Sequence, residues 1–323
     1  MELYKISRKD FKDSFKSARA VSLLTGKSIV YHWVDCIMCI IKYGCCPIQY
    51  QKDSFYKLRS FDREKTYTKG RGYKIKRLLN ESQYLHLVTN KVDFNRCFSD
   101  YIMRPWVYGK DTSKEELLDF LKANDRIIVK PINSMEGIGV YELDRTISDA
   151  ENLRIISGKD ILLERFIIQH PMMEYGAKSV NTIRVNTIMD TQGIVHIIKA
   201  CLRCGIGDAI VDNLSAGGVV YPINIEYGRI EGPGVSHQRK DAFFVHPRTN
   251  FFMLGREIPF WKELLETVTS AAKKVPHIRF IGWDVAITTS GPELIEGNTR
   301  PGASLIENNG VKRGFYKQMM SYR

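Results

Sequence analysis

The sequence lacks the features that mark membrane-spanning, exported and low-complexity proteins. It contains no run of about 18 apolar residues, the length that a membrane-spanning helix needs. The longest apolar stretch, residues 29–41, contains His32 and Asp35 and predicts a core or interfacial helix. The first residues mix acids with bases and show no signal peptide, so we expect a cytoplasmic location. Without repeats or biased tracts, the 323 residues predict a folded chain of about two domains.

Cysteine is scarce, and its odd count of seven without an export signal predicts reduced thiols. Two Cys-x-x-Cys pairs are present, Cys36 with Cys39 and Cys201 with Cys204. Two such pairs can form a four-thiolate zinc site. The first pair lies in an apolar helical run, and the second lies in a strand pattern, where residues three apart point to opposite faces. We therefore expect no zinc.

Positive charge is abundant but unevenly distributed. Residues 1–100 contain 20 lysines and arginines against 10 acids, whereas the other 223 residues contain 28 against 26. A basic segment of this kind suits nucleic acid, an anionic membrane surface or an acidic polymer; a solvated lysine-rich helical surface is the alternative. No nucleic-acid-binding motif accompanies the charge, so we expect no nucleic-acid partner, while peripheral membrane contact through this segment stays open.

The hydrophobic spacing predicts a helical first segment followed by a mixed α+β body. The body begins near residue 90, and Thr112 with Glu115 predicts a capping box at the start of one of its helices. The predicted helices are residues 11–24, 29–42, 73–84, 114–123 and one between Pro259 and Pro276. The predicted strands lie within residues 126–140, 160–166, 181–189, 194–202 and 279–288.

Two carboxylates are predicted to face each other in a hairpin near the end of the chain. A hairpin centred on residue 290 pairs Asp284 with Glu296. Directly opposed carboxylates repel each other unless one is protonated or a cation lies between them. Asn298 adds a neutral oxygen on the same strand face, and oxygen ligands of this kind suit Mg²⁺. We expect a metal site here, with Arg300 at its exit; two exposed polar positions on a surface hairpin are the alternative.

A glycine-containing loop follows a predicted strand that ends in a lysine. Gly137 and Gly139 let main-chain amides approach an anion, and Lys130 offers a point charge for phosphate. The loop is not a Walker loop, because no Gly-Lys-Ser/Thr follows and no helix opens after the glycines. A plain hairpin is the alternative.

Three cations are predicted to share one face of the next hairpin. If the turn at residues 190–193 pairs positions whose numbers sum to 383, Arg184, Lys199 and Arg203 all project from the same side. Neither strand contains an acid that would neutralise them on that face. Cations without a counter-charge favour an anionic ligand.

Taken together, these residues resemble an ATP-grasp enzyme. The similarity rests on Lys91, Lys130, residues 134–139, residues 163–167 and Asp284 with residues 296–300. Residues 179–185, 212–218 and 280–284 are similar to stretches of the branch associated with sugar transfer and polysaccharide genes. The resemblance covers about residues 85–310 and, more weakly, the helical N-terminal segment. It implies an α+β fold in which two subdomains, residues 91–168 and 169–323, hold ATP, preceded by a mainly helical basic segment, residues 1–90.

The resemblance also implies roles for individual residues. Lys91 and Lys130 would contact the phosphates, and Glu164 with main-chain groups of Arg165 and Ile167 would recognise adenine. The other implied assignments are a loop closing over the phosphates through Ser134, Glu136, Gly137 and Gly139, two Mg²⁺ ions on Asp284, Glu296 and Asn298, and catalytic contacts from Arg300, Arg184 and Arg203.

The activity implied is that of an ATP-dependent carboxylate–amine ligase working through an acyl phosphate. We expect a small-molecule carboxylate and an amine as substrates, with an amino acid joined to a sugar or glycan precursor. Phosphorylation of a hydroxyl and ATP binding without turnover are the alternatives. The sequence identifies neither substrate, and it fixes neither the general base nor the oligomeric state.

Overall fold

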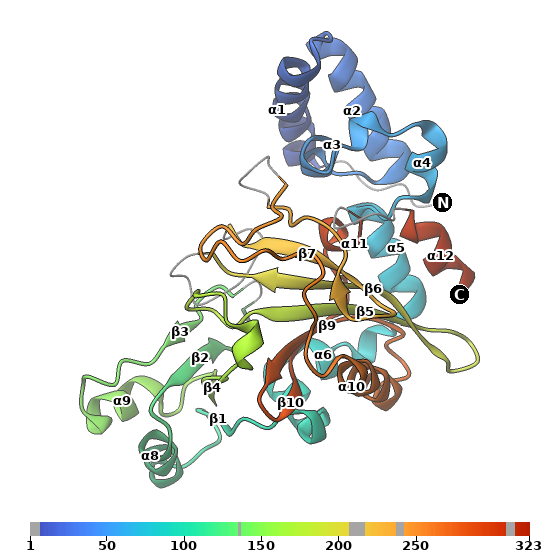
Figure 1. The fold of residues 1–323 in the computed structure, drawn as a ribbon. Helices are drawn as coiled ribbons and strands as arrows, with labels where there is room; N and C mark the ends of the chain where they lie inside the picture. The colour runs from blue at the N-terminus through green and yellow to red at the C-terminus, as the bar shows by residue number, and fades with distance from the viewer. Residues whose placement is uncertain (1–6, 135–136, 207–216, 237–241, 308–313) are drawn as a thin grey trace.

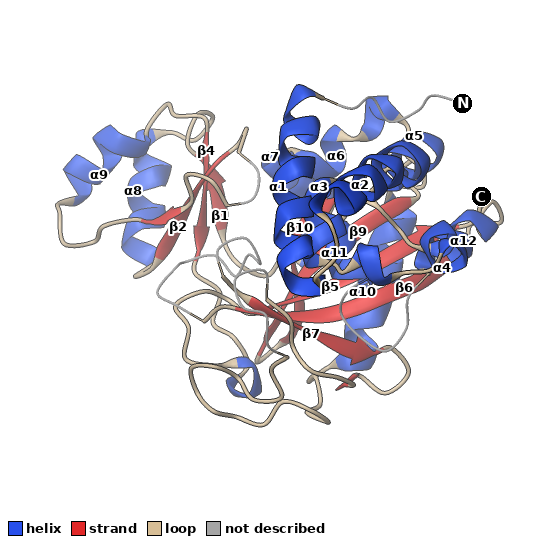
Figure 2. Cartoon of the chain, turned by 90° about the horizontal axis from the view of Figure 1, so that it is seen from above, coloured by secondary structure: helices blue, strands red, loops and turns tan. Residues whose placement is uncertain are grey.

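The computed structural model describes all residues except 1–6, 135–136, 207–216, 237–241 and 308–313. It has the predicted α+β architecture: a helical group at the N-terminal end, a small sheet and a larger sheet (Figure 1). Viewed from above, the small sheet with its two helices stands to one side of the larger sheet (Figure 2).

The small sheet has four antiparallel strands in the order β1-β4-β2-β3. Its apolar side packs against two helices that both begin with a capping box. The first box is formed by Ser113 and Glu116, so the prediction of Thr112 and Glu115 was wrong by one residue. The elements are β1 (Trp106–Tyr108), α8 (Lys114–Ala123), β2 (Ile127–Pro131), β3 (Tyr141–Glu142), α9 (Asp149–Ile156) and β4 (Ile161–Arg165).

The larger sheet has six antiparallel strands in the order β10-β9-β5-β6-β7-β8. One face packs against an amphipathic helix, α10 (Trp261–Lys274), through Leu264 and Val268. Trp283 is fully buried at the centre of this core, where Phe98 meets its ring edge-on at 5.3 Å. The strands are β5 (Thr182–Met189), β6 (Val195–Cys204), β7 (Val219–Asn224), β8 (Arg229–Ile230), β9 (Phe280–Thr288) and β10 (Gly291–Asn298).

Helices from both ends of the chain complete the molecule. The predicted helix 73–84 begins earlier and ends at residue 79, because Asn80 leaves the helix and bonds the main chain of Phe280 at 2.8 Å. The helices are α1 (Arg8–Thr25), α2 (Ile29–Tyr43), α3 (Pro47–Lys52), α4 (Ser60–Lys65), α5 (Lys69–Leu79), α6 (His86–Thr89), α7 (Lys91–Cys97), α11 (Ala303–Glu307) and α12 (Phe315–Ser321). In the described part of the chain, no helix is long and apolar enough to cross a bilayer.

The helices near residue 90 share cores with the larger sheet. Val88 of α6 and Phe94 of α7 belong to the same buried cluster as Trp283 of β9. Further upstream, Ile75 and Leu79 of α5 pack in a second cluster with Phe280. The domain division at residue 90 stays a prediction.

The last hairpin contains an irregularity that decides which residues face each other. Near its turn the partners are Thr288 with Gly291, a register that, continued, would place Glu296 opposite Trp283. A bulge between Leu294 and Glu296 shifts the pairing by one residue, so that Asp284 lies opposite Glu296. The predicted opposition of the two acids is confirmed, and the bulge is its cause.

The register predicted for the preceding hairpin was wrong by two residues. Arg184 pairs with Cys201, and Thr182 pairs with Arg203, so the paired numbers sum to 385. A bulge between Asn186 and Thr187 shifts this register by one residue from the pairing nearer the turn. Because strand side chains alternate with a period of two, the predicted common face for Arg184, Lys199 and Arg203 is nevertheless correct.

Gly282 leaves room for the chain that returns from the last strand. A Cβ atom at this position would lie 2.6 Å from Cγ of Pro301 and 2.9 Å from Oδ1 of Asn186. We expect Gly282→Ala to lower the free energy of unfolding by about 1–3 kcal/mol through overpacking. Gly302→Ala is the matched control, because its new Cβ would meet nothing closer than 3.9 Å. Urea unfolding followed by circular dichroism measures both; equal midpoints would contradict the assigned contact.

Candidate active site

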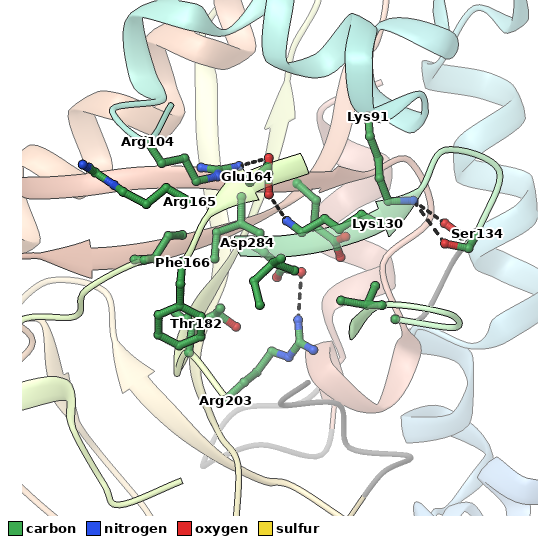
Figure 3. A pocket seen from close by; sticks show the side chains of 17 residues that line it. Lys91, Arg104, Lys130, Ser134, Glu164, Arg165, Phe166, Thr182, Arg203 and Asp284 are labelled. Atoms are coloured by element: carbon green, nitrogen blue, oxygen red, sulfur yellow. Dashed lines mark hydrogen bonds and ion pairs between the residues drawn. The ribbon is translucent and has the colours of Figure 1, made fainter. Parts of the chain in front are cut away.

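The two sheets border a cleft of about 880 Å³, a volume that includes its opening to solvent. Residues from both sheets line it, and Figure 3 shows how their side chains converge. The polar lining residues are Lys91, Arg104, Lys130, Ser134, Glu164, Arg165, Thr182, Arg203, Asp284 and Glu296.

Two lysines enter the cleft from the side of the small sheet. Lys130, near the end of β2, forms an ion pair with Glu164 of β4 (Figure 3). Lys91, the first residue of α7, donates to the carbonyl oxygens of Pro131 at 2.8 Å and Ser134 at 2.6 Å. Burial lowers the pKa of Lys91 below its ordinary value. The ammonium of Lys91 therefore holds the start of the glycine-containing loop beside the cleft.

The loop after β2 has the backbone that its glycines predict. Gly137 and Gly139 both adopt φ of 73°, a left-handed conformation that other residues rarely accept. Val129 of β2 then pairs with Tyr141 of β3, so the predicted strand, loop and strand are confirmed. Ser134 and Gly137 line the cleft. Glu136, expected in this loop, lies outside the described residues.

A buried arginine that the sequence analysis missed joins the two sheets. The Nη2 atom of Arg104 donates to Glu164 of β4 at 2.8 Å, and its Nη1 atom donates to Glu293 of β10 at 2.7 Å. All three residues are at least 96% buried. Burial alone would raise the pKa of Glu164, but Arg104 and Lys130 hold it well below its ordinary value. Arg104 precedes Pro105 in a loop without a recognisable motif. The only signal that could have indicated its role is that Glu164 and Glu293, once buried, need a positively charged partner.

The larger sheet contributes an acid held between two arginines. Asp284 Oδ1 accepts from Arg184 Nε at 2.5 Å, and its Oδ2 accepts from Arg184 Nη2 at 2.7 Å and from Arg203 Nη1 at 2.8 Å. Burial alone would raise the pKa of Asp284, but the two guanidinium groups lower it. The expectation that Arg184 and Arg203 lack a counter-charge was therefore wrong, because β9 lies directly beside β5 and supplies Asp284. Lys199 similarly has Glu231 at 3.7 Å.

Among the residues that the structure describes, no arginine forms an ion pair with Glu296, which lines the cleft beside Asp284. The surrounding protein and, second, the neighbouring Asp284 raise the pKa of Glu296 to about 7, although the residue is exposed to the cleft. Asn298, two residues along the strand, has its Nδ2 atom 3.4 Å from Oε1 of Glu296. The oxygen atoms here suit a hard cation, because Glu296 offers a carboxyl group beside the arginine-bound Asp284 and Asn298 offers an amide oxygen.

No group of three or more His, Cys, Asp or Glu able to hold a metal occurs in the described residues. Mg²⁺ usually binds one or two carboxylates and completes its shell with substrate phosphates and water. Two carboxylates beside the lysines of the facing wall match that requirement. The residues present therefore suit a magnesium–nucleotide pair better than a metal bound by protein alone.

Some predicted site residues lie away from the cleft lining. Arg300 places its guanidinium over the ring of Tyr73, 4.1 Å from the ring centre. Arg184 reaches the cleft only through Asp284, and Asn298 lies beside Glu296. Arg165 and Ile167, predicted to recognise adenine, line the cleft beside the additional residues Phe166, Val180 and Thr182.

Comparison with known families agrees with this geometry. The profile described as "Sugar-transfer associated ATP-grasp" matches residues 71–318, which is most of the chain. The chain belongs to this family. The match includes both sheets, the cleft between them and, upstream of the sheets, α6, α7 and most of α5. It begins within α5, so it takes in part of the helical N-terminal segment, where a weaker resemblance was expected.

The chain is similar to several solved structures at low sequence identity. An ADP complex of PurK, an N5-carboxyaminoimidazole ribonucleotide synthetase, is 10% identical with a TM-score of 0.50, covering 75% of this chain and 53% of that chain. The ligase PsnB, solved with a minimal precursor, Mg and ADP, is 15% identical with a TM-score of 0.45, covering 76% and 61%. D-alanyl-alanine synthetase A from Vibrio cholerae O1 biovar eltor is 16% identical with a TM-score of 0.43, covering 73% and 65%.

This chain thus spans less than two thirds of the length of these three structures. No curated protein sequence matches it.

The bridge through Arg104 gives a stability prediction. Arg104→Met leaves Glu164 and Glu293 buried without their shared cation, which is expected to cost about 3–5 kcal/mol of unfolding free energy. Arg126→Met is the control: it removes the exposed pair with Glu142 and should cost at most about 1 kcal/mol. Chemical denaturation measures both variants. A loss for Arg104→Met no larger than that for the control would show that the bridge does not hold the sheets together.

Proposed function

We propose that this protein is an ATP-dependent carboxylate–amine ligase that works through an acyl phosphate and joins an amino acid to a sugar or glycan precursor. One observation carries the proposal: Lys130 of the small sheet and Lys91 of α7 line one cleft together with two opposed carboxyl groups from the larger sheet. This arrangement suits a polyphosphate, because cations line one side and metal-binding oxygens the other. The family description supports a sugar-linked substrate.

ATP would lie with its phosphates between these two sides. Lys130 and the glycine-containing loop would bind phosphate oxygens, and Lys91 would hold that loop in place through its carbonyl oxygens. The Glu164 side chain accepts from Asn95 and Arg104 and pairs with Lys130. We therefore assign the Glu164 side chain to positioning Lys130, and adenine recognition to main-chain groups of residues 164–167 at the cleft.

Asp284, Glu296 and Asn298 would hold two Mg²⁺ ions, which supply positive charge against the phosphates. Arg184 and Arg203 fix the orientation of the Asp284 carboxylate toward that position through three hydrogen bonds. Arg203, which itself lines the cleft, would in addition face the transferred phosphoryl group or the substrate carboxylate. Arg300, whose guanidinium lies over the ring of Tyr73, would face the reacting group at the exit of the site.

The reaction proceeds in two balanced steps. A substrate carboxylate oxygen attacks the γ-phosphorus of ATP, forming an acyl phosphate while the bond to the β-phosphate oxygen breaks and ADP leaves. An amine then attacks the acyl carbon, phosphate departs and the amine loses a proton, which gives the amide. The residues of the cleft contribute alignment and charge neutralisation to the first step.

Glu296→Gln tests the proposal while keeping the shape of the side chain. We expect it to lower ADP formation by a factor of about 10² to 10³, because a charged oxygen at the phosphates is lost. Glu257→Gln, at an exposed pair with Arg229, should leave turnover unchanged. ADP release is measured with Mg-ATP and mixtures of carboxylates, amines and sugars.

The same assay separates the ligase from a kinase. A ligase releases ADP in quantity only when carboxylate and amine are both supplied, whereas a kinase requires a hydroxyl compound alone. Near-normal turnover of Glu296→Gln would contradict the assigned site. ADP release with a hydroxyl acceptor and no amine would replace ligation by phosphorylation.

A further inference from the structure

The second helix is apolar on two opposite sides, and only one of them is covered. Its inner side packs Cys36, Cys39 and Ile40 into a cluster with Val21 of α1 and Tyr50 of α3. Its outer side presents a row at helical spacing that is 38–65% exposed: Val30, Val34, Met38 and Ile41. A helix that is hydrophobic all round normally has both sides buried. The outer row, which we call the α2 stripe, is therefore an unpartnered face.

The apolar surface extends beyond α2 onto α1. Phe11 and Phe15 are about half exposed, and both meet the ring of Trp33 edge-on, at 5.4 and 6.1 Å between ring centres. Trp33 precedes Val34 of the stripe. At the end of α1, Leu23 is 83% exposed beside the turn that leads into α2. The stripe thus belongs to one apolar surface formed by both helices, at the end of the molecule farthest from the small sheet (Figure 1).

A basic row borders this apolar surface. Lys9, Lys12, Lys16 and Arg19 are spaced by three, four and three residues and are all exposed, so they share one face of α1. Lys12 and Arg19 lie three residues before and four residues after Phe15, which makes them its neighbours on the helix surface. Lys16 is 3.8 Å from Asp13 across an exposed pair. The single acid of α2, Asp35, bonds Arg63 and Tyr50 away from the stripe.

We propose that this surface of α1 and α2 docks on a membrane leaflet that contains anionic lipid. Apolar side chains inserted at the headgroup boundary beside a row of lysine and arginine are the combination that binds such surfaces. The charge complementarity favours lipid over a second copy of this chain. A twofold pairing of the same face would bring two basic rows toward each other, whereas a leaflet presents negative charge throughout. The proposal is independent of the reaction assigned to the cleft.

Vesicle sedimentation of the full chain tests the surface. Phosphatidylcholine vesicles containing phosphatidylglycerol should bind the protein, pure phosphatidylcholine vesicles should bind it at least tenfold more weakly, and added salt should weaken the binding. Trp33 provides a second readout, because its emission should shift to shorter wavelength on anionic vesicles, and Trp33→Phe should remove that shift.

Two groups of substitutions separate the apolar and basic contributions. We expect the bound fraction to fall at least tenfold for the apolar group Val30→Ser, Val34→Ser, Met38→Ser, and likewise for the basic group Lys9→Gln, Lys12→Gln, Lys16→Gln, Arg19→Gln. Matched controls change equally exposed residues elsewhere: Ile155→Ser, Phe244→Ser, Phe252→Ser for the first group and Lys110→Gln, Lys114→Gln, Lys122→Gln, Lys159→Gln for the second. All these positions are at the surface, and circular dichroism checks that each variant is folded.

Three outcomes would overturn the proposal. Binding that the controls weaken as much as the α1 and α2 variants would show non-specific attraction. Absence of binding to anionic vesicles would remove the leaflet as partner. A concentration-dependent dimer that the apolar variant abolishes, measured by light scattering, would assign the surface to a second copy of this chain.

Discussion

One guanidinium group sets the distance between the two sides of the cleft. Arg104 reaches Glu164 on the small sheet and Glu293 on the larger sheet, and it also donates to the carbonyl oxygen of Leu294. Because removing a charge from a buried set leaves the others uncompensated, the two sheets cannot separate here without a large cost in free energy. Glu164 in turn pairs with Lys130, so the same network positions a lysine that points toward the proposed phosphate site.

In the larger sheet, the strand register positions the charged side chains that line the cleft. The bulge between Leu294 and Glu296 places Glu296 opposite Asp284, while the pairing of β5 with β9 places Arg184 opposite the same acid. Asp284 is neutralised by arginines, whereas Glu296 keeps a raised pKa of about 7, caused by the surrounding protein and by Asp284. One acid of the pair is thus fixed in charge and orientation, and the other remains available to a cation.

Much of this arrangement was accessible from the sequence, and the remainder depended on contacts between distant segments. Alternating strands and a turn at residue 290 predicted that Asp284 and Glu296 lie opposite each other, although the structure reaches this pairing through a bulge that the pattern did not reveal. The neighbour of β5 could not be read from local pattern, so Asp284 was missed as the partner of Arg184 and Arg203. Strand β7 was also missed, since Pro222 within it is atypical of a sheet interior. The partners of Arg104, Glu164 and Glu293, lie 60 and 189 positions further along the chain, and no sequence pattern relates residues so far apart.

The N-terminal segment, which shares cores with the larger sheet, also forms hydrogen bonds to the chain just beyond the end of the last strand. Tyr67 donates its hydroxyl to the carbonyl oxygen of Pro301 at 3.2 Å, and Asn80 donates to that of Thr299 at 3.2 Å. Tyr73 stacks under Arg300. These contacts fix the chain directly after Asn298, where strand pairing has ended and the backbone would otherwise lack partners. The helical segment therefore carries two separate surfaces: an inner one that holds the exit of the site, and the apolar and basic outer one on α1 and α2.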